Sequence, residues 1–225
     1  MGAGDIERIV FVSVIHTDLE SVNETRRVVK ATRPDVVAVE LDHERYRQLS
    51  NPPDPEETPI VAGDAAQDLM QQLALLEKSL GEFTGSDVGD EMMTAIKEGR
   101  AIGARIALID RPMTETIQAM MKVPVDELYR LIGMLPDATK DIEEGGAFNL
   151  LAMLKEDGAV EDLIAEFRKE FPSLASVLIE QRDQYVAKAL KFILNDVDGK
   201  IVVVLGAGHV QGVKSALKTM LQENN

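Results

Sequence analysis

The sequence contains no cysteine, and this absence excludes disulfide bonds, thiolate metal sites and cysteine nucleophiles. Basic residues are also scarce, because 24 lysines and arginines stand against 39 aspartates and glutamates, for a formal net charge of −15. Nucleic-acid binding and docking on anionic lipid both depend on clustered positive charge. The acidic balance therefore argues against a nucleic-acid partner and against an anionic membrane surface.

Long hydrophobic runs are missing as well. No apolar stretch approaches the roughly 18–20 residues that span a membrane, and the N-terminus lacks the basic and apolar segments of a signal peptide. We therefore expect a soluble, cytoplasmic chain with no membrane span, or the soluble domain of a membrane-associated protein. The 45% hydrophobic and 28% charged residues are typical of a globular protein, and we expect a single domain over residues 1–225.

What the sequence does have is a set of short apolar runs rich in β-branched residues, typical of strands covered on both faces. The predicted strands are Ile9–Ile15, Asp35–Leu41, Ala101–Ile109 and the start of Ile201–His209, with Ile60 and Val61 as a further short strand. The first two flank a predicted helix that begins near Ser21, where Ser21 and Glu24 have capping-box spacing. Strand, helix and strand make a right-handed βαβ unit with parallel strands.

Helical patterns fill much of the remaining chain. Apolar residues spaced four and three apart predict a long amphipathic helix between Ala62 and Leu80. Residues 113–171 are interpreted as a helical insertion of several short helices, separated by Pro124, Pro136, Gly145–Gly146 and Gly158. Methionine is concentrated in this insertion, which indicates adaptable core packing or, alternatively, a plastic apolar groove for a peptide or a flat ligand.

Polar side chains follow three of the predicted strands. His16 follows the first strand, Glu40 lies at the end of the second, and His209 follows the last. Because ligands bind beyond the carboxyl ends of parallel strands, we expect these side chains to meet in one site. Two imidazoles and a carboxylate suit Zn, Mn, Co or Fe, so the sequence predicts a divalent metal site; the alternative is that each imidazole only caps a strand end.

Hydrolysis at such a metal also needs a general acid or base, and Glu91 and Asp110 are the candidates. Arg45, Arg111 and Arg182 could orient a substrate carboxylate or stabilise an oxyanion. The alternative for Glu91 is an acid placed at a helix N-terminus, and the alternative for each arginine is an internal ion pair. We assign the catalytic roles to Glu91 and Arg182, and substrate binding to Arg45, Asp110 and Arg111.

The glycines of the segment Gly206-Ala-Gly208 have two interpretations. A glycine-rich turn can cradle a phosphate group, but this one lacks the spacing of a dinucleotide fingerprint. We prefer the interpretation that Gly206 and Gly208 let the backbone approach a metal-bound substrate closely.

Several blocks, in order along nearly the whole chain, resemble one family. They are Ser13-Val-Ile-His16, the run from Pro34 to Asp42, Gly89-x-Glu91, Asp110-Arg111-Pro112, Arg182-Asp183 and Gly206-Ala-Gly-His209. The set resembles the TraB family, which includes the PrgY-like pheromone-shutdown proteins and is similar to GumN and to the TIKI metalloproteases. Two positions depart from the family pattern, because Ser13 stands in place of a glycine and Gln181 in place of a glutamate.

The resemblance implies an α/β fold of the EreA/ChaN-like type, with a mixed, largely parallel central sheet flanked by helices and carrying a helical insertion. It also implies metal-dependent cleavage of peptides, with His16, Glu40 and His209 as ligands of Mn, Co or Zn. The alternative is a protein that binds a peptide or a haem-like ligand without turnover. A third hypothesis is a non-catalytic scaffold that acts as a homo-oligomer.

Overall fold

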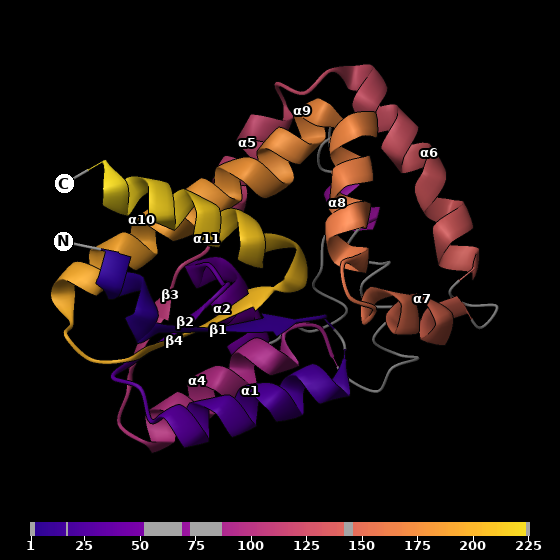
Figure 1. Ribbon diagram of the computed structural model, residues 1–225. Helices are drawn as coiled ribbons and strands as arrows, with labels where there is room; N and C mark the ends of the chain where they lie inside the picture. Colours follow the sequence, from indigo (N-terminus) through magenta and orange to yellow (C-terminus); the bar gives the residue numbers. More distant parts are fainter. Residues whose placement is uncertain (1–2, 17, 52–68, 73–86, 142–145, 224–225) are drawn as a thin grey trace.

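The computed structural model describes residues 3–16, 18–51, 69–72, 87–141 and 146–223, and within them four strands form one parallel sheet (Figure 1). The strands are β1 (Ile9–Val14), β2 (Val36–Val39), β3 (Arg105–Leu108) and β4 (Ile201–Gly206). Their order across the sheet is β1-β4-β2-β3, so the last strand lies between the first two. The α/β class predicted from the sequence is confirmed, and the first strand, at one edge of the sheet, pairs with the last.

The register aligns the carboxyl ends of the strands at one edge. Ile9 and Val36 both lie opposite Ile201, on either side of β4. Every residue of β2 and β4 is buried, which suits the valine-rich sequences of both strands. β3 is shorter than predicted because the helix before it extends to Ala101, and Gly103, with φ at 82°, then turns the chain into the strand.

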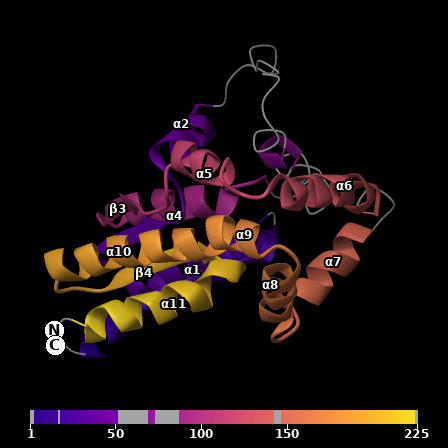
Figure 2. The ribbon, with the colours of Figure 1, turned by 90° about the horizontal axis from the view of Figure 1, so that it is seen from above.

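Helices cover both faces of the sheet (Figures 1 and 2). α1 (Leu19–Thr32) and α4 (Asp90–Ala101) lie on one face, and α10 (Gln181–Asp196) and α11 (Ala207–Gln222) lie on the other. The side chains of β4 alternate between the two resulting cores. Val202 and Val204 pack in the cluster that includes Ile96 of α4, whereas Val203 packs in the cluster that includes Leu190 of α10. Two short helices, η1 (Ala3–Arg8) and α2 (His43–Ser50), complete this part.

Two predicted helix boundaries are wrong. α1 begins at Leu19, two residues before Ser21, because Asp18 and not Ser21 is its N-cap and accepts a hydrogen bond from the Ser21 N–H at 3.1 Å. The break predicted at Pro136 does not occur, since α6 (Val125–Asp141) runs through that position. A proline inside a helix removes one hydrogen bond, but Leu128 and Leu135, which precede it, are both anchored in the same buried cluster.

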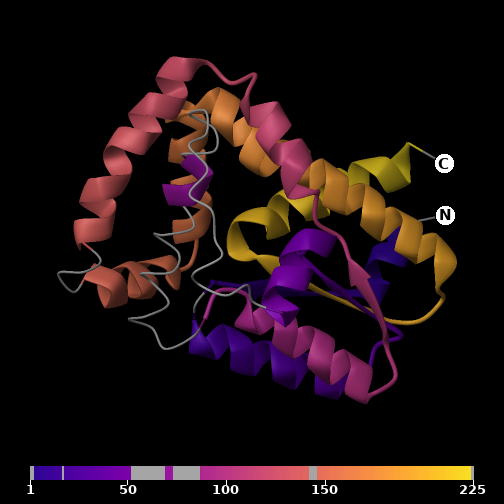
Figure 3. The same ribbon diagram turned by 180° about the vertical axis from the view of Figure 1, so that it is seen from behind.

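The remaining helices form a second region beside the sheet (Figure 3). They are α5 (Met113–Met120), α6, α7 (Ala147–Leu154) and α8 (Ala159–Glu170), followed by α9 (Pro172–Ala175) and the π-helical turn η4 (Ser176–Glu180) that leads into α10. Of the helix predicted between Ala62 and Leu80, residues 69–72 are described and are helical. The strand predicted at Ile60 and Val61 lies outside the described residues. Across the part of the chain that the structure describes, no helix is long and apolar enough to span a membrane.

Candidate functional site

Seven titratable side chains gather beyond the carboxyl edge of the sheet, and we call this group the polar centre. Its members are His16, Glu40, Glu91, Asp110, Arg182, Asp183 and His209. They come from the segments that follow β1, β2 and β3 and from the first turns of α4, α10 and α11. His209 therefore lies on a helix, because α11 begins at Ala207, directly after β4.

Glu40 lies in the middle of the polar centre and is only 5% exposed. Its Oε1 accepts a hydrogen bond from Arg182 Nη2 at 2.7 Å and lies 3.5 Å from His209 Nε2. Its Oε2 accepts a hydrogen bond from the Gly206 N–H at 2.7 Å. The carboxylate that ends the second strand is thus tied to the end of the last strand and to two helices.

Gly206 is the point at which His16 approaches this group. A Cβ atom at Gly206 would lie 3.1 Å from His16 Nε2 and 3.4 Å from Glu40 Oε2. The missing side chain therefore lets an imidazole and a carboxylate come close to the same stretch of backbone. Gly208 has another surrounding, because a Cβ there would meet Ile164 of α8 at 3.3 Å.

Each imidazole is held by a buried carboxylate on its Nδ1 side. His16 Nδ1 lies 2.5 Å from Glu91 Oε1, and His209 Nδ1 lies 2.7 Å from Asp183 Oδ1. An acceptor at Nδ1 keeps the proton of a neutral imidazole there, so the lone pair is on Nε2. Both Nε2 atoms are close to Glu40 or to the Gly206 backbone beside it.

Asp183 was not singled out as a site residue from the sequence, although it is 3% exposed and contacts His209 directly. The signals were its position next to Arg182 and its place in the block Arg182-Asp183, neither of which reveals its partner. A Cβ at Gly212, one turn after His209 on α11, would lie 1.8 Å from Asp183 Oδ2. Gly212 thus leaves the space that Asp183 needs to reach the imidazole.

Arg182 joins the two sides of the polar centre. Its Nε and Nη2 donate to the two oxygens of Asp110 at 3.1 and 2.7 Å, a bidentate pair, and its Nη1 lies 3.3 Å from His209 Nε2. Burial lowers the pKa of Arg182, but the carboxylates of Glu40 and Asp110 outweigh burial and raise it. Arg182 is therefore a permanent cation in contact with two buried carboxylates.

The polar centre buries more negative than fixed positive charge. Its carboxylates are each at most 7% exposed, and Arg182 is its one arginine or lysine. The carboxylates are Glu40, Glu91, Asp110 and Asp183. Because an uncompensated buried charge is costly, the remaining negative charge calls for protons on the imidazoles or carboxyls, or for an added cation.

The two carboxyls closest to His209 differ in their titration. Burial alone raises the pKa of Glu40, but His209, Arg182 and His16 together outweigh burial and lower this pKa to about 2. Burial also raises the pKa of Asp183, and there the hydrogen bond from His209 does not reverse the effect. Glu40 is therefore the carboxylate that stays ionised, and Asp183 is the one that more readily holds a proton.

The other predicted residues lie outside this network. Arg111 turns away from the sheet and donates to Gln181 Oε1 at 2.9 Å and to the Glu115 carbonyl at 3.1 Å. Arg45 donates its backbone N–H to Asp42, the N-cap of α2, at 2.7 Å, and its guanidinium makes no hydrogen bond to the polar centre among the described residues. The same Asp42 side chain accepts from the Met113 N–H at 2.6 Å and so ties α2 to the start of α5.

Both departures from the family pattern fall outside the polar centre. The Ser13 side chain is exposed on β1, so it does not crowd His16. The Gln181 side chain accepts a hydrogen bond from Arg111 and, within the described residues, makes none to Arg182 or Glu40. Neither departure therefore removes a side chain from the group around Glu40.

A metal site is not preformed in the described ranges, where no three His, Asp or Glu side chains are grouped as ready ligands for one ion. Arg182 accounts for part of this, because its guanidinium contacts both Glu40 Oε1 and His209 Nε2. Nevertheless, His16, Glu40 and His209 bring two imidazoles and a carboxylate to one place, and they are the residues that could hold a divalent ion.

Comparison with known proteins covers nearly the whole chain. Residues 4–224 match the model of the TraB/PrgY/gumN family. A protein of Methanocaldococcus jannaschii, described as uncharacterized, is 28% identical over 225 residues, which cover 96% of this chain and 55% of that protein. The TraB domain-containing proteins of Bos taurus and Homo sapiens are each 24% identical, over 97% of this chain and 65% of their own length. The chain thus spans between about half and two thirds of the length of these relatives.

Proposed function

Because the chain belongs to the TraB/PrgY/gumN family, we propose that its polar centre is the active site of a metal-dependent hydrolase that acts on peptides. One observation carries the proposal. Two imidazoles from opposite ends of the chain, each backed by a buried carboxylate, lie close to one ionised glutamate or to the Gly206 backbone bonded to it. A carboxylate behind a histidine is typical of metal-binding imidazoles, since it orients the ring and makes Nε2 more basic.

His16, Glu40 and His209 would hold the ion, and the excess of buried negative charge around them favours a divalent cation such as Mn, Co or Zn. When bound, the metal supplies a Lewis acid that polarises a carbonyl group and makes a bound water more acidic. His209 can take part only if Arg182 gives up its contact with Nε2, which is 3.3 Å long. Arg182, held by its bidentate pair with Asp110, would be the cation of the polar centre that stabilises a developing oxyanion.

Glu91 is the candidate for moving a proton. Its Oε1 contacts His16 Nδ1, and its buried Oε2 has no hydrogen-bond partner among the described residues. An unpartnered carboxylate oxygen in a buried site is costly and is available to a substrate or water that enters. Glu91 would therefore accept a proton during attack and return it to the leaving amine.

A second function is favoured by one specific observation. Arg182 already provides a cation between Glu40 and His209, which is the arrangement that a metal-free binding protein would use. In that case the protein sequesters a peptide or a haem-like ligand and releases no product. Mass spectrometry of a peptide mixture separates the two functions, because new cleavage products appear only if the site is catalytic.

Metal binding by the full chain tests the main proposal. Protein stripped with a chelator is titrated with Mn, Co and Zn by calorimetry, and His209→Ala is compared with His43→Ala as a matched control. His43 is exposed at the start of α2, so its loss leaves the site intact. We expect about one ion per chain in the wild type and in the control, and binding at least roughly tenfold weaker in His209→Ala. Absence of binding to the wild type, or equal binding by both variants, would falsify the metal site.

A further inference from the structure

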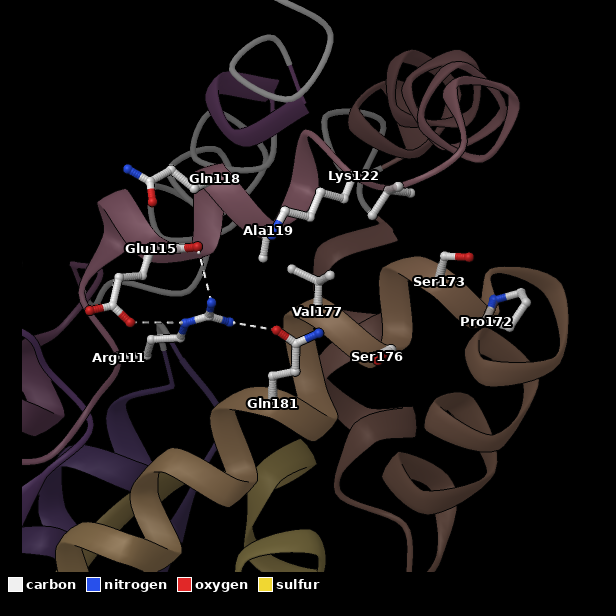
Figure 4. Close-up of a pocket in the computed structure, with 11 residues that line it drawn as sticks. Arg111, Glu115, Gln118, Ala119, Lys122, Pro172, Ser173, Ser176, Val177 and Gln181 are labelled. Atoms are coloured by element: carbon white, nitrogen blue, oxygen red, sulfur yellow. Dashed lines mark hydrogen bonds and ion pairs between the residues drawn. The ribbon is translucent and has the colours of Figure 1, made fainter.

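A groove with a volume of about 850 Å³ lies between α5 and the α9–η4 segment (Figure 4). This volume is in the usual range of ligand pockets. Its walls include the π-helical turn η4, through Ser176 and Val177, and π-helical turns occur frequently at functional sites. The groove is open along α5, whose eight residues correspond to about 12 Å of helix. That length equals three or four residues of extended peptide.

The groove adjoins the polar centre through two pairs of consecutive residues. Asp110 and Arg182 belong to the polar centre, whereas their neighbours Arg111 and Gln181 line the groove. Figure 4 shows Arg111 between Glu115 of α5 and Gln181 at the start of α10. The wall of the groove is therefore continuous in sequence with the polar centre at two points.

The charged side chains of the groove leave an excess of positive charge. Among the described residues that line the groove, they are Arg111, Lys122 and Glu115. Glu115 Oε2 lies 3.6 Å from Arg111 Nε and offsets one cation. The side chain of Lys122, just beyond the end of α5, makes no hydrogen bond or ion pair with any residue that the structure describes. In a chain with a net charge of −15, a cavity with surplus positive charge favours a ligand that carries carboxylates.

The groove keeps its net positive charge because Gln181 is neutral. Its Oε1 accepts a hydrogen bond from Arg111 Nη1 at 2.9 Å, but an amide adds no charge. A glutamate at the same position would accept the same bond and would add a second carboxylate beside Arg111. The groove would then hold two carboxylates against two cations, and the preference for an anionic ligand would be lost.

We propose that the groove binds an extended stretch of peptide, three or four residues long, that carries one or more carboxylates, and that the neutral Gln181 sets this charge preference. Apolar Val123 and Val177 contact the aliphatic parts of the ligand, while Arg111 and Lys122 receive its carboxylates. The identification of the ligand as a peptide rests on the proposed function. The charge preference rests on the groove alone.

The test measures binding and not turnover. Two fluorescein-labelled hexapeptides, identical except that one has two glutamates where the other has two glutamines, are titrated against metal-free full-length protein. Fluorescence anisotropy reports binding to the wild type and to Gln181→Glu, Lys122→Gln and Lys97→Gln. Lys97 is exposed on α4, on the face of the sheet opposite α10 (Figure 1), and does not line the groove, so it serves as the matched control.

We expect the wild type and the Lys97 control to prefer the glutamate peptide by roughly tenfold. Gln181→Glu and Lys122→Gln should each remove most of that preference without changing affinity for the glutamine peptide. Equal affinity of the wild type for both peptides, or no binding tighter than about 1 mM, overturns the proposal, as does an unchanged preference in Gln181→Glu. Because no metal is present, failure of the metal site leaves this outcome unaffected.

Discussion

The ion pairs of Arg182 in the polar centre and of Arg130 in the helical segment 113–171 differ in burial. In the polar centre, Glu40 and Asp110 are buried against Arg182. In the helical segment, the pair between Arg130 and Glu170 lies at the surface, with 52% and 47% of the two side chains exposed. This segment also contributes six of the nine large apolar side chains that are exposed among the described residues. They are Met121, Val125, Tyr129, Met134, Met153 and Leu163.

The difference in burial follows from the secondary structure of each region, which is a parallel sheet in one and helices in the other. Parallel strands align their carboxyl ends, so polar side chains from several segments converge and can satisfy one another away from water. A helix packed along one stripe leaves its other face to the solvent, whatever residues stand there. Loss of one partner of an ion pair should therefore cost more stability in the polar centre than in the helical segment. In the polar centre the remaining charge is buried and uncompensated, whereas in the helical segment it is hydrated.

Removal of one arginine from each region should show the largest contrast. Arg182→Met leaves two buried carboxylates without their guanidinium, and we expect it to lower the free energy of unfolding by about 3–5 kcal/mol. Arg130→Met removes an exposed pair and a contact with the Phe171 ring at 4.9 Å, and should cost about 0–1 kcal/mol. Urea unfolding of both variants gives the comparison. Equal losses would mean that burial does not distinguish the two pairs.

We expect the buried carboxylate of Glu40 to contribute to the loss of stability at low pH. Its pKa falls from the ordinary value of 4.5 to about 2 on folding, so the unfolded chain binds the proton more readily. The stabilisation is fully present above pH 4.5 and is lost as the pH falls toward 2, by at most about 3 kcal/mol. Glu40→Gln should flatten the stability profile in that window. Glu24→Gln is the control, because the Glu24 pair with Arg27 is exposed. A profile unchanged by Glu40→Gln would contradict the assignment.

The same substitution at two helical glycines should have opposite signs. Gly212→Ala places a Cβ where Asp183 Oδ2 would be 1.8 Å away, and we expect it to cost about 1–3 kcal/mol. It should also weaken metal binding, since Asp183 holds His209. Gly133→Ala, in α6, meets nothing within 4 Å and should add up to about 1 kcal/mol of stability from helix propensity. Thermal unfolding of the two variants measures the sign of each change in stability. A stabilised Gly212→Ala variant would contradict the prediction and would show that Asp183 has room to move.

The sequence predicted the strands that matter for the polar centre and the residues at their ends. The apolar runs before His16 and His209, and the run that ends at Glu40, are long enough and valine-rich enough to be recognised without a partner. Boundaries that depend on one side chain were less accurate. Asp18 is the N-cap of α1 in place of the predicted capping box, and α6 is continuous through Pro136, with Leu128 and Leu135 before it packed in a buried cluster.

The individual contacts made by the side chains of α10 could not be predicted from the sequence. Nothing in the local pattern of α10 indicates that Asp183 reaches His209, that Arg182 lies between Asp110 and Glu40, or that Gln181 turns to Arg111 instead. Adjacent residues on a helix point about 100° apart, so three consecutive side chains of α10 have three different surroundings.

By itself, the sequence determined the hydrophobic periodicity, the polar residues at the strand ends and the excess of negative charge, because these are properties of neighbouring residues or of composition. The tertiary structure alone decided that β4 inserts between β1 and β2. This placement of β4 brings His209 close to His16 and Glu40. It also gathers four carboxylates in one buried site, where they outnumber the single arginine. Strand order results from the packing of whole elements on both faces of the sheet, and no local stretch of sequence contains that information.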